Sequence, residues 1–372
     1  MNSFKLSVES LYDGEEIHEH RTLTIRDGII ESITACDSDE EVKAGMLIPG
    51  FIDVQVNGGG GYLFNADPCL TVIEKIGKAH AQFGTTGWLP TLVTDSYQQM
   101  LAAADAIAEV RANNITGVLG IHFEGPFLSL EKKGIHCKKF IRNITDKELA
   151  LFSRTELGCV MLTIAPENVS TSQIKELVDS GVIVSIGHSA ANFEQAVAAV
   201  KAGATGFTHL YNAMSPLTSR EPGVVGAALV SDKTFSGIIM DGIHVHPGAA
   251  KIALNSRTNL VLITDAMPLV GTIDREFEFF GQSITRKKDR LTDSEGRLAG
   301  STLDMLSAVI NASGLLEIDF LQAVDLATKN PADYLGLESK YGRIKANYRA
   351  SMLLLDKDKN IQSSWIDGRK II

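Results

Sequence analysis

The chain has 372 residues, 44% of them hydrophobic and 22% charged, and a formal net charge of −10 at pH 7. This length allows about two domains, or one large α/β barrel with an accessory piece, and the composition is typical of a soluble globular protein. The acidic balance argues against nucleic acid as the main partner, because binding a phosphate backbone needs a basic face.

The N-terminal segment MNSFKLSVESLYDGEE lacks the apolar core of a signal peptide, and no apolar run is long enough to span a bilayer. The four cysteines, Cys36, Cys69, Cys137 and Cys159, show no CxxC spacing. In a long chain with so few cysteines, this indicates reduced thiols. We therefore predict a cytoplasmic protein with no membrane partner.

Both ends of the chain are rich in short strand patterns. FKLSVESLYDG, RTLTIRDG and IIESITAC follow one another near the N-terminus, with Asp-Gly hairpin signals at 13–14 and 27–28. The C-terminal stretch ASMLLLDKDKNIQSSWIDGRKII has the same character and an Asp-Gly signal at 367–368. We predict one small β-sandwich domain built from residues 1–49 and 336–372.

From Pro49 onward, strand patterns alternate with helical ones. Helices are predicted at about 68–83 and from about Ser96, with Asp95 or Ser96 as the cap. Eight strands with intervening helices over residues 50–335 predict a (β/α)₈ TIM-type barrel. An open doubly wound sheet is the alternative; the barrel is favoured because polar residues follow nearly every strand. The predicted strands are GFIDVQVNG, TGWLPTLV, VLGIHFEG, CVMLTIAPE, VIVSIG, ATGFTHL, FSGIIMDG and LVLITDAM.

Two histidines occupy equivalent places in a strand–helix–strand unit over residues 181–216. His188 ends the first strand of this unit and His209 ends the second. Parallel strands bring their C-terminal ends side by side, so both imidazoles reach one place. A lone histidine is more often buried against a backbone partner, but a pair placed in this way favours metal ligation.

Further polar residues at strand ends complete a candidate hydrolytic site. Glu124 and the two histidines make three ligands with an open fourth position, as a catalytic divalent metal requires. Such a metal lowers the pKa of bound water to about 7. A carboxylate outside the ligand set must then take the proton and pass it to the leaving group. Asp265, in ITDAM, is the candidate, with helix capping as its alternative interpretation.

Motifs along essentially the whole chain resemble the N-acetylglucosamine-6-phosphate deacetylase family of the amidohydrolase superfamily. THLYNAM together with HFEGP is specific to this family, whereas GFID alone indicates only an amidohydrolase. The resemblance implies deacetylation of N-acetyl-D-glucosamine 6-phosphate to D-glucosamine 6-phosphate and acetate by a metal-bound hydroxide, in amino-sugar catabolism. The motifs are PGFIDVQVNG, HFEGPF, KKGIH, LTIAPE, IGHS, THLYNAMSP, MDGIHV, ITDAM and LAGSTLDM.

The same resemblance implies a role for individual residues. Glu124, His188 and His209 match the metal ligands, and zinc is the expected ion. Asp265 matches the general base and acid, and His136 matches the imidazole that polarises the amide carbonyl. The implied sugar- and phosphate-binding positions are His136, Asn212, Ala213, Arg220, His244 and the turn formed by Leu298, Ala299 and Gly300.

In relatives the neighbouring subunit completes the phosphate pocket, so the resemblance implies a homodimer. The guanidinium of Arg220 suits this task, because it binds phosphate oxygens in a fork. Without the resemblance, Arg220 reads as a solvated loop charge. Lysines 132, 133, 138 and 139 around His136 could add a positive field, although exposed loop lysines are common.

One departure from the superfamily pattern affects the number of metals. Many amidohydrolases carry His-x-His at the end of the first strand for a second metal, and this chain has Gln55-x-Asn57 there. Neutral amides are poor metal ligands beside imidazole, so we predict one tightly held divalent ion. His122 shares a strand face with Glu124 and is either a support for the ligands or a packed core histidine.

Two alternatives to this function stay open. One is a deacetylase of N-acetylgalactosamine 6-phosphate or another N-acyl amino sugar, because residue identity does not settle the configuration at C4. The other is a non-catalytic scaffold with the amidohydrolase fold; such proteins lose ligands or the base, and this chain keeps them all.

Overall fold

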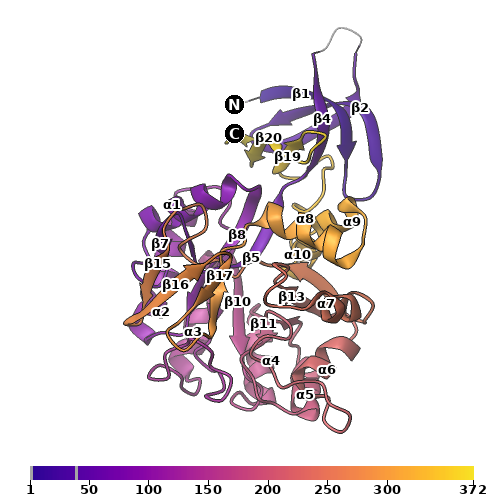
Figure 1. Ribbon diagram of the computed structural model, residues 1–372. Helices are drawn as coiled ribbons and strands as arrows, with labels where there is room; N and C mark the ends of the chain where they lie inside the picture. Colours follow the sequence, from indigo (N-terminus) through magenta and orange to yellow (C-terminus); the bar gives the residue numbers. More distant parts are fainter. Residues whose placement is uncertain (1–2, 38–40) are drawn as a thin grey trace.

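The computed structural model describes residues 3–37 and 41–372, and Figure 1 shows a barrel with a smaller sheet above it. Residues 1–2 and 38–40, which fall in the predicted range 1–49, lie outside the described residues. Among the helices of the described residues, none is long and apolar enough to cross a membrane. The four cysteines are free thiols, as predicted.

The larger unit is the predicted barrel of eight parallel strands with surrounding helices. Neighbouring strands are paired in chain order, and a parallel bridge between Val56 and Ala266 joins the first strand to the segment after the last. Two of the strands, Phe51–Val56 and Thr85–Val93, are buried along their whole length, as expected for strands covered on both faces. The strands are β5 (Phe51–Val56), β8 (Thr85–Val93), β9 (Gly120–Glu124), β10 (Cys159–Ile164), β11 (Ile183–Ile186), β12 (Gly206–Phe207), β13 (Phe235–Ile238) and β14 (Asn259–Leu262).

Helices connect the strands, and several of them begin at a side-chain cap. Ser96 caps α2, where its hydroxyl accepts a hydrogen bond from Gln99 N, and Asn192 caps α5 by accepting from Gln195 N. The sequence offered Asp95 or Ser96 as the cap of this helix, and Ser96 is the cap. The helices are α1 (Leu70–Ala81), α2 (Tyr97–Ala112), α3 (Asp146–Phe152), α4 (Thr171–Asp179), α5 (Phe193–Lys201), α6 (Gly223–Val230), α7 (Pro247–Leu254), α8 (Met305–Leu316), α9 (Phe320–Ala327) and α10 (Lys329–Tyr334).

The smaller unit is a sheet formed by both ends of the chain (Figure 1), consistent with the predicted β-sandwich. Backbone hydrogen bonds from Ile30 to Tyr348 and from Ala350 to Gly28, both 2.9 Å, bring its two ends together around a separate apolar core. The domain limits themselves stay a prediction. In sheet order the strands are β21 (Arg369–Lys370), β20 (Ile361–Ile366), β19 (Met352–Leu355), β4 (Val42–Pro49), β1 (Ser3–Tyr12), β2 (Ile17–Arg26) and β3 (Ile29–Ala35).

A four-stranded antiparallel sheet between β14 and α8 was not predicted. The expected turn at Leu298, Ala299 and Gly300 is instead part of its last strand. The hairpin pattern EFEFFGQSITRKKDRLT explains the difference, since its alternating apolar residues build a core of their own around Phe279, Ile284 and Leu291. The strands are β15 (Glu276–Phe279), β16 (Gln282–Lys287), β17 (Arg290–Thr292) and β18 (Leu298–Ser301).

Candidate active site

A pocket of about 440 Å³ opens at the C-terminal ends of the barrel strands, and most of the predicted site residues line it. This is the face on which parallel barrels carry their catalytic groups. The loop before α3 contributes one wall and β18 contributes another. The predicted residues in its lining are Asn57, Glu124, His136, His188, His209, Asn212, Ala213, His244, Asp265, Leu298 and Gly300.

The backbone turns sharply where three site residues follow their strands. His188, His209 and Asp265 have φ values of +47°, +36° and +50°, in the left-handed region that non-glycine residues rarely adopt. Each such residue costs roughly 1 kcal/mol or more, and such costs concentrate at functional sites. The same unusual conformation after β11, β12 and β14 sets these residues apart from ordinary strand ends.

Glu124, His188 and His209 converge on one point. His188 Nε2 and His209 Nε2 lie 3.2 Å and 3.0 Å from Glu124 Oε1, and 2.9 Å from each other. All three side chains are buried. Ligand atoms held about 2 Å from one cation lie roughly 3 Å apart, so this spacing fits a divalent metal ion.

The outer nitrogens of the two imidazoles decide what the inner nitrogens can do. His188 Nδ1 lies 2.8 Å from Lys132 O, and His209 Nδ1 lies 3.1 Å from Asn212 O. Carbonyl oxygens only accept, so each Nδ1 carries the proton and each Nε2 of the neutral ring presents a lone pair. Two lone pairs and a carboxylate oxygen facing one another repel unless a cation lies between them. The donor set therefore fits a metal.

The electrostatics of the cluster also favour a cation. Burial opposes ionisation of Glu124, but its close contacts with the His188 and His209 rings hold its pKa well below the usual range. Burial alone would lower the pKa of His209. The negative charges of Glu124 and Asp265 outweigh the effect of burial, so the pKa of His209 is raised. The negative charges of Glu124 and Asp265 therefore favour a positive charge at this buried point.

Asp265 lies beside the cluster and is held by two amides. Its Oδ1 accepts hydrogen bonds from Asn57 Nδ2 at 2.7 Å and Gln55 Nε2 at 3.2 Å. Burial and the nearby charge of Glu124 raise the pKa of Asp265 to about 6. Gln55 Nε2 also donates to Glu124 Oε1 at 3.0 Å. The Gln55 amide thus presents donors, not a metal-binding oxygen, to the two carboxylates.

The side-chain oxygen of Asn57 is a potential ligand-binding group in the pocket. Its Oδ1 is buried and has no hydrogen-bond partner among residues 3–37 and 41–372. A buried acceptor without a partner is costly, so such an atom needs a donor from outside the chain. Asn57 lines the pocket, where a water molecule or a substrate group can supply that donor.

His136 lines the pocket beside His188, with ring centroids 4.2 Å apart. Its Nε2 lies 3.8 Å from Glu124 Oε2, and its Nδ1 lies 2.8 Å from the Thr94 hydroxyl oxygen. Burial, followed by the proximity of His188, holds the pKa of His136 well below its usual value. The ring is therefore neutral.

His244 is held by a carboxylate that sequence reasoning missed. His244 Nδ1 lies 2.6 Å from Asp241 Oδ2, and Asp241 Oδ1 accepts from the backbone N–H groups of Ile243 and His244. Burial opposes ionisation, but the contact with His244 lowers the pKa of Asp241. The spacing D-x-x-H in MDGIH was the available signal, since three residues bring a carboxylate back onto a turn.

Some predicted residues lie elsewhere. Arg220 is exposed and does not line the pocket of its own chain. Ala299 is buried in the core of the four-stranded sheet. His122 proves to be a packed core histidine between Thr163 Oγ1 at 2.8 Å and Val54 O at 3.1 Å. Burial lowers the pKa of His122 to about 4.

Arg297, another residue that the sequence did not single out, lines the pocket with Lys132 and Lys133. Arg297 Nε and Nη2 both lie 2.7 Å from Asp293 Oδ2, and its Nη1 lies 2.9 Å from Glu295. These ion pairs fix its position at the rim. Its place in a hairpin absent from the predicted elements explains why it was missed.

Comparisons with known proteins agree with this geometry. Residues 46–371 match the Amidohydrolase family. An N-acetylgalactosamine-6-phosphate deacetylase of Shewanella sp. (strain ANA-3) is 46% identical over 94% of this chain and 91% of the relative. An N-acetylglucosamine-6-phosphate deacetylase of Haemophilus influenzae is 33% identical over 88% and 87%. The solved N-acetylglucosamine-6-phosphate deacetylase of Pasteurella multocida is 31% identical, with a TM-score of 0.94 over 99% of each chain.

Proposed function

The chain belongs to the amidohydrolase family, and on this basis we propose that it deacetylates N-acetylhexosamine 6-phosphates in amino-sugar catabolism, releasing acetate and the amino sugar phosphate. The observation that carries the proposal is the convergence of Glu124, His188 and His209, with Asp265 beside them. Three metal ligands with an adjacent unligated carboxylate are the parts that metal-assisted amide hydrolysis requires.

Glu124, His188 and His209 are the proposed metal ligands, and zinc is the proposed ion. A divalent ion bound there would lower the pKa of a coordinated water and polarise the amide carbonyl. Gln55 and Asn57 hold Asp265 Oδ1, which leaves Oδ2 to accept the proton of the attacking water. Asp265 then delivers this proton to the nitrogen of the departing amine, since expelling an unprotonated amine is unfavourable.

His136 is the proposed second donor to the amide oxygen, and this role requires a proton on Nε2. The single proton of the Thr94 hydroxyl has two acceptors within reach, Glu124 O at 3.0 Å and His136 Nδ1 at 2.8 Å. The proposed role assigns this proton to His136 Nδ1. This arrangement would leave Nε2–H of the neutral ring directed into the pocket, where it can stabilise the developing oxyanion.

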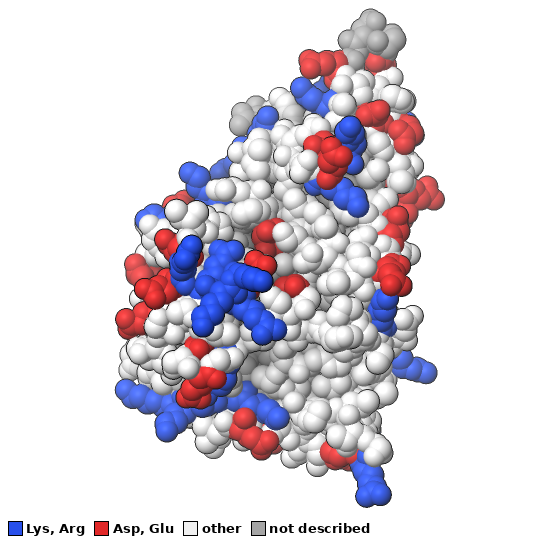
Figure 2. All heavy atoms as spheres, viewed as in Figure 1, with Lys and Arg blue, Asp and Glu red and all other residues white. Residues whose placement is uncertain are grey.

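The pocket rim carries the cations that a phosphorylated substrate needs. Lys132, Lys133 and Arg297 belong to the pocket itself. Figure 2 shows Lys and Arg gathered where Figure 1 places β16 and β17. Arg286 and Lys287 belong to β16. Such a patch raises the local concentration of anions despite the acidic balance of the chain.

We assign the remaining sugar and phosphate contacts to residues around the pocket mouth. His244, fixed by Asp241, is positioned for a phosphate or hydroxyl group. Arg220 would act from the partner subunit of a homodimer, which is consistent with its exposure and its absence from the pocket of its own chain. The protein is proposed to act in the cytoplasm. The other proposed sugar-binding positions are Asn212, Ala213, Leu298, Ala299 and Gly300, with Ala299 contributing only through its backbone.

Two sugars are candidates for the natural substrate. Solved structures at a TM-score of 0.90 or above are named for N-acetylglucosamine 6-phosphate. The 46% identical relative is named for N-acetylgalactosamine 6-phosphate, which favours this sugar as the second candidate. Acetate release from both compounds, measured in parallel on one preparation, tests the proposal. Equal inactivity toward both would reject it, and the ratio of kcat/KM values identifies the preferred sugar.

A further inference from the structure

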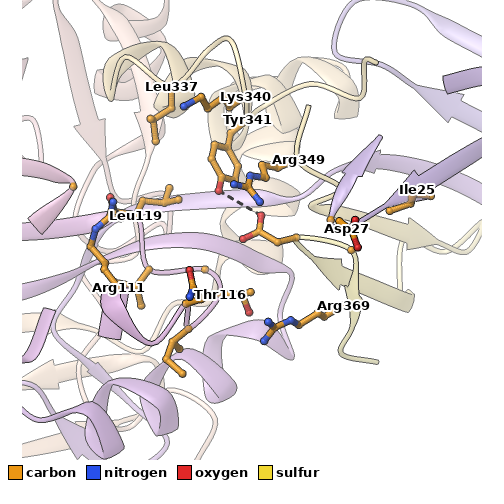
Figure 3. Close-up of a pocket in the computed structure, with 18 of the residues that line it drawn as sticks. Ile25, Asp27, Arg111, Thr116, Leu119, Leu337, Lys340, Tyr341, Arg349 and Arg369 are labelled. Carbon is orange, nitrogen blue, oxygen red and sulfur yellow. Dashed lines mark hydrogen bonds between the residues drawn. The ribbon is translucent and has the colours of Figure 1, made fainter. Parts of the chain in front are cut away.

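A second cavity, larger than the catalytic pocket, lies at the opposite end of the barrel strands. It has a volume of about 1090 Å³ and separates the barrel from the small sheet (Figure 3). The barrel wall consists of residues 114–119, which lead into β9, and of the start of β10 at Cys159. Glu124 stands at the other end of β9, so this crevice is distinct from the active site.

The opposite wall is built from two Asp-Gly hairpin turns that the sequence predicted and the catalytic site does not use. They lie at 27–28 and 367–368, and both glycines have positive φ values, +81° and +74°. A Cβ atom on Gly28 would lie 2.5 Å from Asp367 O, so the two turns touch. Only glycine permits this approach, and the contact makes the wall a defined surface.

The crevice holds more cations than carboxylates. Five basic side chains line it; burial raises the pKa of Asp367, and the nearby charges of Arg349 and Arg369 oppose this effect. Two carboxylates, Asp27 and Asp367, share the lining. The crevice thus carries an excess of positive charge, although the chain as a whole has a net charge of −10. The cations are Arg111, Lys340, Arg349, Arg369 and Lys370.

The hydrogen bonds of the lining involve hydroxyl groups and backbone oxygens. Asp367 Oδ1 accepts hydrogen bonds from the Tyr341 hydroxyl at 3.4 Å and the Ser351 hydroxyl at 3.3 Å. Arg111 donates to the backbone oxygens of Glu156 and Leu119. These carbonyls orient its guanidinium without neutralising it. Figure 3 shows Arg111, Arg349 and Arg369 on different sides of the opening.

We propose that this crevice binds a phosphate-bearing small molecule at a site separate from the catalytic pocket. Guanidinium groups bind phosphate oxygens in a fork, and several of them from different segments can surround one phosphate. The confinement of the cations between two walls selects a small ligand over a nucleic acid, which needs an extended basic face. A bound ligand would contact both the small sheet and the barrel, next to the start of β9.

The two tryptophans of the chain provide a local reporter of binding. Trp88 exchanges backbone hydrogen bonds with Gly117 and Leu119, and Trp365 pairs with Lys370 across the small sheet. Neither tryptophan lines the catalytic pocket. Tryptophan fluorescence is therefore titrated with inorganic phosphate, and separately with glucosamine 6-phosphate, with sodium chloride added to keep the ionic strength constant. A saturable change is expected with at least one ligand, and its absence with both overturns the proposal.

Variants then locate the binding event. Arg349→Gln should weaken binding about tenfold, the usual effect of losing one charge-assisted hydrogen bond. Lys340→Gln combined with Arg369→Gln should weaken it similarly, and both residues are exposed, so folding is preserved. Arg257→Gln, in a surface pair with Asp232, is the control that should bind as the wild type does. Unchanged affinity in both crevice variants would overturn the proposal.

Two comparisons identify the ligand and show whether it binds in the crevice or in the catalytic pocket. Tighter binding of glucosamine 6-phosphate than of inorganic phosphate assigns a sugar phosphate as the ligand, and equal binding assigns the phosphate group alone. The fluorescence change should persist when Lys132→Gln and Lys133→Gln are combined, since both lysines line the catalytic pocket and not the crevice. A change abolished by this double variant and retained in the crevice variants would assign the event to the catalytic pocket and contradict the proposal. Because no turnover is measured, the outcome is independent of the deacetylase assignment.

Discussion

Asp265 combines a raised pKa, two amide donors on one oxygen and a place beside three candidate metal ligands. Asp265→Asn keeps the shape of the side chain and removes its ability to accept a proton. We expect metal content to stay at the wild-type level while kcat falls by at least about 100-fold, the usual contribution of a general base. Elemental analysis and a steady-state assay check this. Loss of the metal in this variant would instead make Asp265 a ligand.

The raised pKa of Asp265 also predicts a pH dependence. Burial and the charge of Glu124 favour the protonated form and raise the pKa to about 6. A bound cation favours the ionised form and lowers the pKa again. Because the base acts when ionised, kcat/KM should fall as the pH falls through a value at or below about 6. A pH–rate profile measures this, and an acidic limb that persists unchanged in Asp265→Asn would assign it to another group.

Thr94 is a positioning residue for the neighbouring imidazole. Thr94→Val removes the hydroxyl that contacts His136 Nδ1 at 2.8 Å and keeps the volume of the side chain. Losing one such hydrogen bond costs about 1 kcal/mol, so kcat should fall about fivefold with little change in KM. Thr94→Ser retains the hydroxyl and should restore kcat. If valine and serine behave alike, the hydroxyl does not set the tautomer of His136.

At the scale of elements, the long loop between β9 and α3 holds His136 and depends on one arginine. Arg142 donates to Glu148 Oε1 at 3.0 Å, to Asp95 O at 2.8 Å and to Phe140 O at 2.9 Å. It thus joins the loop to the segment before α2 and to the capping box of α3, where Thr145 also contacts Glu148. Burial opposes ionisation of Glu148, but hydrogen bonds from Thr145 and Arg142 lower its pKa.

Arg142→Gln should therefore weaken the loop and the fold together. Glu148 is fully buried, so removing its cationic partner leaves a buried charge supported only by the contacts with Thr145. We expect a loss of roughly 2–3 kcal/mol in the free energy of unfolding, measured by denaturant titration. Arg154→Gln is a matched control, because Arg154 pairs with exposed Asp105 and Glu156 and should cost less than about 1 kcal/mol. Equal losses would contradict this account of the loop.

The elements that carry the site residues explain which of these residues the sequence could predict. His188 and His209 were predictable because β-branched runs and a helix between them determine where both strands end. Arg297 was not, because it belongs to a hairpin whose contacts are set by packing, whereas Asp241 could have been found from its D-x-x-H spacing with His244. Arg220 is exposed, as the interpretation of a solvated loop charge predicts. The tautomers of His188 and His209 depend on backbone carbonyls from distant loops, which local pattern does not reveal.

At the scale of the whole molecule, the proposed homodimer makes Arg220 a residue of the partner's site. Arg220→Gln should raise KM for the phosphorylated sugar much more than for the unphosphorylated one, because only the former offers an anion to a guanidinium. Steady-state assays with both compounds measure this. Equal effects on both would remove Arg220 from the phosphate site.

Subunit complementation tests whether Arg220 acts across the interface. Asp265→Asn and Arg220→Gln are each expected to be nearly inactive at low substrate concentration. Co-expression yields hybrid dimers in which one of the two sites has an intact Asp265 and an intact Arg220 from the partner. Random pairing predicts recovery of about one quarter of wild-type activity. No recovery, with dimers verified by sedimentation, would place Arg220 in its own subunit's site.

The central claim is that one divalent ion, held by Glu124, His188 and His209, is needed to hydrolyse the acetamide of a sugar phosphate. It is tested most directly by quantifying bound metal in the purified protein alongside acetate release from N-acetylglucosamine 6-phosphate and N-acetylgalactosamine 6-phosphate. We predict about one ion per chain and acetate release from at least one sugar, with both lost in His209→Ala. Undiminished acetate release from protein stripped of metal, or none from metal-loaded protein, would contradict the claim.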